Sequence, residues 1–141
     1  MTTIAADRFG MAADQKVVDG DTNYRTRKIW PIGRAIVGAA GDNTAIVKFT
    51  RWMEKGGKGK TPTFDAEEDF EAMVLTPAGL FVYDKSCQPD EVADPFYAIG
   101  SGKQAALAAM HMGATPQRAV EIACLVDNYS GEPVDTMTIG A

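Results

Sequence analysis

The hydrophobic positions of this chain fall into short runs separated by turn residues, which is the pattern of β-strands. Residues 2–6 and 10–14 flank Asp7-Arg8-Phe9 and predict a β-hairpin whose first strand begins at the chain terminus. A second hairpin is predicted where Pro77 and Gly79 join two apolar runs. In all, we expect strands at residues 2–6, 10–14, 26–29, 34–40, 70–75, 80–84, 96–99 and 134–139.

Three other segments have the features of helices. In the first, apolar residues such as Ile46, Phe49 and Trp52 recur at helical spacing, and Ser101 and Thr115 can cap the other two. We expect helices from Asp42 or Asn43 to Gly56, from Ser101 to Gly113 and from Thr115 to about Val126. Because hairpins imply antiparallel sheets and the helices lie in blocks between them, this order predicts an α+β layered domain.

Length and composition are those of one globular domain. A chain of 141 residues with a hydrophobic fraction of 45% can bury a core unaided, so we treat residues 1–141 as a single domain. Its net charge of −5 and dispersed basic residues argue against nucleic-acid binding. No apolar run is long enough to span a membrane, and no signal-peptide pattern appears. With only two cysteines, we expect a cytoplasmic protein with reduced thiols.

Conventional catalytic patterns are scarce. The single histidine, His111, lies near a helix end between two methionines, where a packed or surface imidazole is a better interpretation than a base. Cys87 lacks an adjacent histidine or helix N-terminus that would make it a thiolate, and the usual zinc spacings are missing. Gly59-Lys60-Thr61 echoes a phosphate-binding loop, but it follows a helix and Glu54 replaces the first glycine. We interpret it as a solvated connector.

Thr2 is the best candidate nucleophile. If Met1 is removed, Thr2 has both a hydroxyl and a free α-amine, which are a nucleophile and its own base on one Cα. An α-amine has a reference pKa of about 7.7–8.0, so a substantial fraction is unprotonated near neutral pH. The start of the chain therefore suggests N-terminal threonine chemistry.

A series of short blocks along nearly the entire chain resembles the signature blocks of proteasome β-type subunits. The blocks are Thr2-Thr3-Ile4, Gly10-Met11-Ala12-Ala13-Asp14, Arg27-Lys28-Ile29, Gly38-Ala39-Ala40-Gly41-Asp42, Ile99-Gly100-Ser101-Gly102 and Asp127-Asn128-Tyr129-Ser130-Gly131. The short chain and the Met-Thr-Thr start look more like the HslV-type peptidase of bacteria, whereas the Asp-x-x-Ser-Gly block at residues 127–131 looks more like the proteasome β-subunit proper. The resemblance implies an N-terminal-nucleophile hydrolase, with a four-layer α-β-β-α sandwich of two antiparallel sheets, threonine peptidase activity and no cofactor.

The resemblance also implies a catalytic set, carried over residue by residue. Thr2 matches the catalytic threonine, and Lys28 matches a lysine that Asp14 holds. A buried ammonium near Thr2 favours the neutral amine, and Asp14 offsets the cost of burying that charge. Gly41 matches the glycine whose backbone N–H forms the oxyanion hole, and Gly38 is a poorer candidate.

Supporting groups and a substrate pocket follow from the same resemblance. Ser101, Asp127 and Ser130 match the hydrogen-bonding group that orients the threonine amine, although Ser101 also works as a helix cap and the other two as a helix-ending turn. A small Ala39 at the pocket floor suggests space for an apolar substrate side chain. The residues expected to line this pocket are Val17, Val18, Thr26, Trp30, Ala39 and Asn43.

The resemblance further implies identical subunits in stacked rings, which a possible ATP-dependent unfoldase supplies with polypeptide substrate. The sequence has no nucleotide motif, so ATP chemistry would belong to that partner. Two alternatives remain open. The chain could be an inactive structural ring subunit in which a retained Met1 blocks the amine, or an amidohydrolase that uses the same chemistry on small amides, since fold does not fix substrate.

Overall fold

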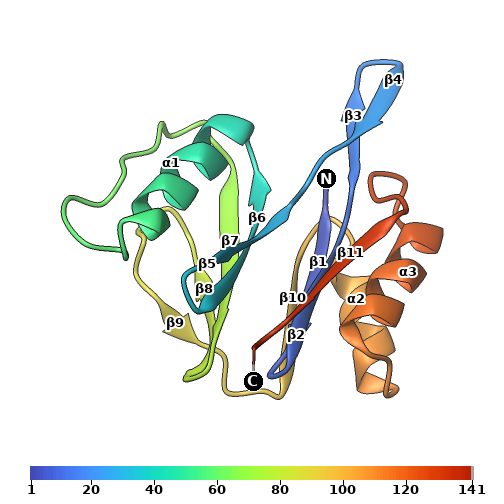
Figure 1. Ribbon diagram of the computed structural model, residues 1–141. Helices are drawn as coiled ribbons and strands as arrows, with labels where there is room; N and C mark the ends of the chain where they lie inside the picture. The colour runs from blue at the N-terminus through green and yellow to red at the C-terminus, as the bar shows by residue number, and fades with distance from the viewer. Residues whose placement is uncertain (141) are drawn as a thin grey trace.

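The computed structural model describes residues 1–140, in which two antiparallel sheets pack face to face with helices on both outer sides (Figure 1). The first sheet contains β10 (Phe96–Gly100), β1 (Thr3–Asp7), β2 (Gly10–Asp14) and β11 (Val134–Thr138), in that order. The second contains β5 (Ile29–Ile32), β6 (Ala35–Gly41), β7 (Phe70–Thr76), β8 (Gly79–Tyr83) and β9 (Asp90–Glu91). Helix α1 (Asn43–Glu54) covers the second sheet, and α2 (Lys103–His111) and α3 (Pro116–Val126) cover the first. The predicted four-layer sandwich is confirmed.

The strand pattern assigns each side chain to one of three apolar layers. On β1, Ile4 and Ala6 face the second sheet, whereas Ala5 between them packs against α2 and α3. Phe49 of α1 is fully buried against β6 and β7 in the third layer. Residues 34–40 were expected to be buried on both faces, and β6 is indeed central, between α1 and the first sheet. These layers fix the first strand, and with it Thr2, inside the molecule.

A separate two-stranded hairpin, β3 (Lys16–Asp19) with β4 (Thr22–Arg25), extends beyond the sandwich (Figure 1). The sequence indicated only its turn at Asp19-Gly20-Asp21, where Gly20 has a positive φ of 61°. Its strands are short and β4 is exposed throughout, so neither shows the apolar alternation that sequence analysis looks for. The hairpin rises beside the candidate site and supplies part of its wall.

Other differences from the predicted elements have local causes. The strand expected at residues 26–29 is wrong in its bounds, because residues 26–28 lie in no strand and β5 begins at Ile29. β5 continues through Pro31 because it lies at the sheet edge, where proline is tolerated. Ser101 does not cap α2, whose N-cap is Gly102 without a side-chain bond. Thr115 does cap α3, since its hydroxyl accepts from the N–H of Arg118 at 3.2 Å. No helix within residues 1–140 has the length and apolar character needed to cross a membrane.

Candidate active site

Thr2 lies immediately before β1, against the corner that joins β10 to α2. Its backbone N donates to Ser101 Oγ at 3.0 Å, and its carbonyl oxygen accepts from the N–H of Gly102 at 3.2 Å. Gly100 has a φ of 96°, and a Cβ at this position would overlap the Thr2 carbonyl oxygen. The glycines that flank Ser101 therefore let this corner approach Thr2 closely enough to hold its nitrogen.

Behind Thr2, hydroxyls and one carboxylate form a chain of hydrogen bonds. Ser101 Oγ donates to Asp127 Oδ2 at 2.6 Å, and Ser130 Oγ donates to the same oxygen at 2.7 Å. Ser130 Oγ also lies 2.7 Å from Thr3 Oγ1. The structure thus brings together the three residues expected to orient the Thr2 nitrogen, from the β10–α2 corner and the turn after α3.

The environment of Asp127 lowers its pKa below the ordinary value of 3.8. Partial burial acts in the opposite direction, but hydrogen bonds from Ser101, Ser130 and the Tyr129 N–H outweigh it. Asp127 therefore contributes to stability above its ordinary pKa, and this contribution is lost as the pH falls through the lowered value.

The variant Ser101→Ala tests this linkage. Because it removes one donor, the pKa of Asp127 should rise toward its ordinary value and the contribution to stability should shrink. We expect the variant to lose more free energy of unfolding at about pH 6 than at about pH 3, where the carboxylates of both proteins gain protons. Urea unfolding at each pH measures the difference. A loss that is equal at both pH values would show that Asp127 does not respond to Ser101.

Lys28 and Asp14 form a buried ion pair beside Thr2. Lys28 Nζ lies 2.9 Å from Asp14 Oδ1, and the two side chains are 6% and 0% exposed. Asp14 Oδ1 also accepts from the Thr3 N–H at 3.0 Å, and its other oxygen accepts from the N–H groups of Lys16 and Gly131 at 3.2 and 3.0 Å. This carboxylate therefore connects Lys28 to β1, to β3 and to the loop after α3.

Lys28 is directed at the start of the chain. Its ammonium donates to the carbonyl oxygens of Lys16 at 2.6 Å and Met1 at 3.3 Å. The Thr2 hydroxyl donates to the same Met1 oxygen at 2.7 Å, so both groups surround one atom. Burial lowers the pKa of Lys28 below its ordinary value of 10.5, although Asp14 opposes this shift.

A cavity of about 690 Å³ opens in front of Thr2, between the hairpin, β5, β6 and the start of α1. Its lining contains all the residues expected to bind substrate, namely Val17, Val18, Thr26, Trp30, Ala39 and Asn43. Thr2, Lys28 and Gly41 line it as well. Asp14, Ser101, Asp127 and Ser130 are not part of this lining and support Thr2 and Lys28 from behind. The predicted site residues thus divide into a cavity set and a supporting set.

Gly41 lies where β6 leaves the sheet and has a φ of 119°. A Cβ here would overlap the Asp69 carbonyl oxygen, because Asp42 and Asp69 hold the two segments together. The Asp42 N–H donates to the Asp69 carbonyl at 2.8 Å, and the Asp69 N–H donates to Asp42 Oδ2 at 2.7 Å. Gly38, the poorer candidate, lies between the sheets, since a Cβ there would meet Ile4 and Met11.

Sequence reasoning missed several residues of this cavity. Tyr24, Ile46 and Asp69 line it but stand in no recognisable block, and Arg27 lines it but was given no role although it stands beside Lys28 in a block. The turn at Asp19-Gly20-Asp21 is the signal that could have placed Tyr24, because a turn brings the residues on its two sides together. No local pattern connects Asp69 to the site, because tertiary packing alone brings β7 to the end of β6.

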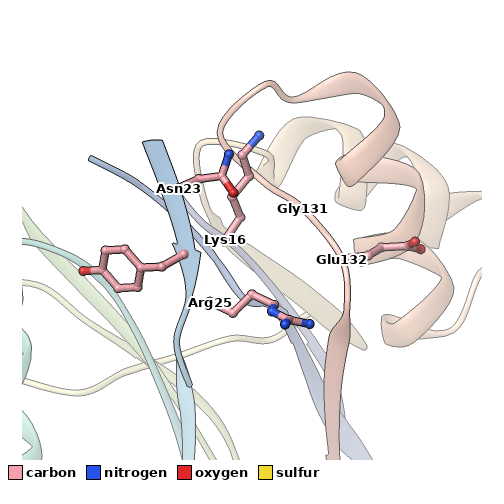
Figure 2. A pocket seen from close by; sticks show the side chains of 6 residues that line it. Lys16, Asn23, Arg25, Gly131 and Glu132 are labelled. Carbon is pink, nitrogen blue, oxygen red and sulfur yellow. The ribbon is translucent and has the colours of Figure 1, made fainter. Parts of the chain in front are cut away.

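The other side of the hairpin borders a second cavity, of about 790 Å³. Figure 2 shows Lys16, Asn23 and Arg25 from the hairpin near Gly131 and Glu132. Thr2, Lys28 and Gly41 do not line it. We therefore place the candidate active site in the cavity that contains Thr2.

The remaining nucleophile and base candidates lie elsewhere. His111 packs edge-on against Phe96, with ring centroids 4.8 Å apart, and is exposed at the end of α2. Burial raises the pKa of Cys87 and raises that of Cys124 to about 11, so neither thiol is activated. Both are free cysteines. Within residues 1–140, these groups offer no alternative to Thr2 as a nucleophile.

Comparison with known proteins gives matches in structure alone. No family model and no curated protein matches the sequence. HslV from Trypanosoma brucei superposes with a TM-score of 0.77 at 20% identity, covering 99% of both chains. The chain has the HslV fold. BPH from Thiobacillus denitrificans is similar over 99% of this chain and 98% of its own, with a TM-score of 0.74 and 20% identity.

The HslV-like fold also extends to a more distant structure. The Anbu (Gly-1) mutant from Hyphomicrobium sp. strain MC1 superposes with a TM-score of 0.71 at 14% identity, covering 98% of this chain and 81% of its own. BPH has also been solved in complex with epoxomicin, and that structure superposes with a TM-score of 0.72. Nearly the whole of the chain takes part in the HslV-like fold in each case.

Proposed function

We propose that the chain is a single-domain threonine peptidase subunit whose nucleophile is Thr2 after removal of Met1. The observation that carries this proposal is the position of Thr2 at the cavity, with its nitrogen 3.0 Å from Ser101 Oγ. That nitrogen becomes the α-amine when Met1 leaves, so the base is already held by the Ser101–Asp127 pair. The HslV-like fold supports the same activity.

The proposed reaction begins when Thr2 Oγ attacks the carbonyl carbon of the scissile peptide bond, and the Thr2 amine takes the hydroxyl proton. The Gly41 N–H stabilises the resulting oxyanion. Collapse of the tetrahedral intermediate breaks the C–N bond, and the leaving amine takes the proton from the Thr2 ammonium. Water then hydrolyses the Thr2 ester and releases the second product.

Lys28 is assigned an electrostatic role. Its ammonium lies on the cavity side of Asp14 and beside the Thr2 hydroxyl, since both donate to one oxygen. A positive charge there disfavours protonation of the Thr2 amine and stabilises developing negative charge on Oγ. Burial of the ion pair removes it from solvent screening, which strengthens both effects.

We further propose that identical subunits assemble into stacked rings and that an ATP-dependent unfoldase supplies unfolded polypeptide. The HslV-like fold supports this assembly, and so do large apolar side chains on the surface. Leu125 and Val126, at the end of α3, are 80% and 69% exposed, and Phe9 at the β1–β2 turn is 78% exposed. Sedimentation velocity tests the assembly, because a monomer at micromolar concentration would contradict it.

Intact-mass analysis followed by substrate profiling tests the peptidase. We expect the purified, assembled protein to lack Met1 and to cleave an unstructured protein and fluorogenic peptides. Retention of Met1 in assembled protein would favour the inactive ring subunit. Hydrolysis of small amides alone would favour the amidohydrolase. Epoxomicin, with which BPH was solved, is a useful inhibitor for this assay. If it binds in the cavity that contains Thr2, it should block the hydrolysis of peptide substrates.

The variant Ala39→Val tests the assignment of the substrate pocket. Ala39 is buried in the cavity wall, and added methyl groups reduce the space for the substrate residue before the scissile bond. We expect kcat/KM for a peptide with leucine at that position to fall about tenfold, and that for an alanine peptide to change less. Equal changes for both peptides would remove Ala39 from the specificity pocket.

A further inference from the structure

Cations gather around a cavity of about 440 Å³ between α1 and the loop that follows it, away from the candidate active site. Every charged residue in its lining is basic: Lys48, Arg51, Lys55, Lys58 and Lys60. Lys48 pairs with Glu68 at 2.9 Å, but the other four form no ion pair within residues 1–140. In a chain with a net charge of −5, this local excess of positive charge is not explained by overall composition.

The same cavity has hydrogen-bond donors without acceptors. Trp52 lines it with an aromatic ring, whose indole nitrogen is itself buried. The backbone N–H groups of Lys58, Gly59 and Lys60 form no hydrogen bond within residues 1–140. None of the lining side chains carries an acceptor oxygen. A ligand that fits these walls must bring several acceptors and several negative charges.

We propose that this cavity binds an oligophosphate group. A phosphate chain carries repeated acceptor-only oxygens and several charges, which matches four unpaired cations. An acidic peptide fits less well, because its backbone N–H groups need acceptors and the side chains that line this cavity provide none. The volume suits a compact ligand. The oligophosphate is either free inorganic polyphosphate or the phosphate tail of a nucleotide.

The geometry of the loop after α1 supports an anion site whose ligands are lysine side chains. Gly56, Gly57 and Gly59 all have positive φ, and they fold the loop back over the end of α1. The Gly57 N–H donates to the Trp52 carbonyl oxygen at 3.1 Å, which holds the loop beside the indole. The loop follows a helix, so it is not the strand–loop–helix cradle of nucleotide-binding proteins, and lysines replace the helix N-terminus as the anion ligands.

Calorimetric titration of the full-length protein with inorganic triphosphate at low salt tests the proposal. We expect saturable binding that weakens as salt is added. The double variant Lys58→Gln/Lys60→Gln should lose about tenfold in affinity. The variant Arg25→Gln/Arg118→Gln removes the same charge elsewhere and should bind within about twofold of the parent protein. Both changes involve surface residues, and thermal unfolding checks that each variant folds.

Three results would overturn the proposal: no saturable binding at millimolar triphosphate, an equal loss in the Arg25/Arg118 variant, or tighter binding of hexaglutamate than of triphosphate. ATP and adenosine distinguish the two sources. Tighter binding of ATP than of triphosphate would identify a nucleotide, whereas equal affinities with no binding of adenosine would identify the phosphate chain alone. Either of these results supports an oligophosphate site.

Discussion

Replacing Thr2 with Ala is expected to reduce peptide hydrolysis by about 10⁴-fold or more, as loss of a catalytic nucleophile does in other hydrolases. The variant lacks the only atom proposed to attack the substrate. Its fold should persist, because the bonds that fix Thr2 to Ser101 and Gly102 use backbone N–H and carbonyl groups. Fluorogenic peptide assays on the assembled protein, with thermal unfolding as a check on folding, measure the effect.

The matched control is Thr2→Ser, which keeps a hydroxyl on the same Cβ and should retain measurable activity. Intact mass of each variant must accompany the assay, because a variant that retains Met1 would be inactive for a different reason. Hydrolysis by Thr2→Ala at the parent rate, with Met1 absent, would exclude Thr2 as the nucleophile.

Replacing Lys28 with Met is expected to destabilise the protein by about 3–5 kcal/mol and to abolish activity. The change leaves the fully buried Asp14 carboxylate without its counter-charge, which is the costly way to break a buried ion pair. The three backbone N–H groups that Asp14 accepts from remain, and they place the loss toward the lower end of that range. Urea unfolding gives the free energy, and peptide assays give the activity.

A double-mutant cycle with Asp14→Asn separates the role of Lys28 in stability from its role in activity. In the Lys28→Met background the asparagine removes an unpaired buried charge, so it should cost less free energy of unfolding than in the parent. Activity should stay low in the two variants that contain Lys28→Met, because neither has the ammonium beside Thr2, whereas the Asp14→Asn single variant keeps Lys28. Additive free energies would show that the pair is not coupled, and an active Lys28→Met protein would remove Lys28 from the mechanism.

Most helices and strands of the fold were predictable from local sequence patterns. The elements that were missed depend on tertiary structure, which local patterns do not report. The short apolar run around Ile4 predicts a strand, and the helical spacing around Phe49 reports one buried helix face, so the first hairpin and α1 were predictable. The strand expected at residues 26–29 stopped short of Pro31, which β5 includes, because a sequence does not say which strands lie at an edge where proline is tolerated. The β3–β4 hairpin was missed because its exposed residues carry no apolar period.

The candidate site was predictable only where residues stand in recognisable blocks. Thr2, Asp14 and Lys28 were placed through resemblance, and no spacing rule alone would have paired an aspartate with a lysine from another segment. Ser101 had two interpretations, and the structure shows that it does not cap α2 and that its hydroxyl donates to Asp127 at 2.6 Å. Asp69 reaches the cavity solely through strand pairing, so its place depended on the tertiary structure.

The hairpin formed by residues 16–25 lets the proposed catalysis and the proposed substrate choice depend on different parts of the chain. The groups proposed for chemistry stand on the sandwich or at its edge, whereas Val17, Val18 and Tyr24 contribute to the cavity from a ribbon that pairs only with itself. Residues 20 and 21 at its tip are exposed and lie between the two strands of the hairpin. We therefore expect exchanges of Val17, Val18 or Tyr24 to reshape substrate choice, over evolutionary time or in the laboratory, while the nucleophile and its ion pair keep their places on the sandwich.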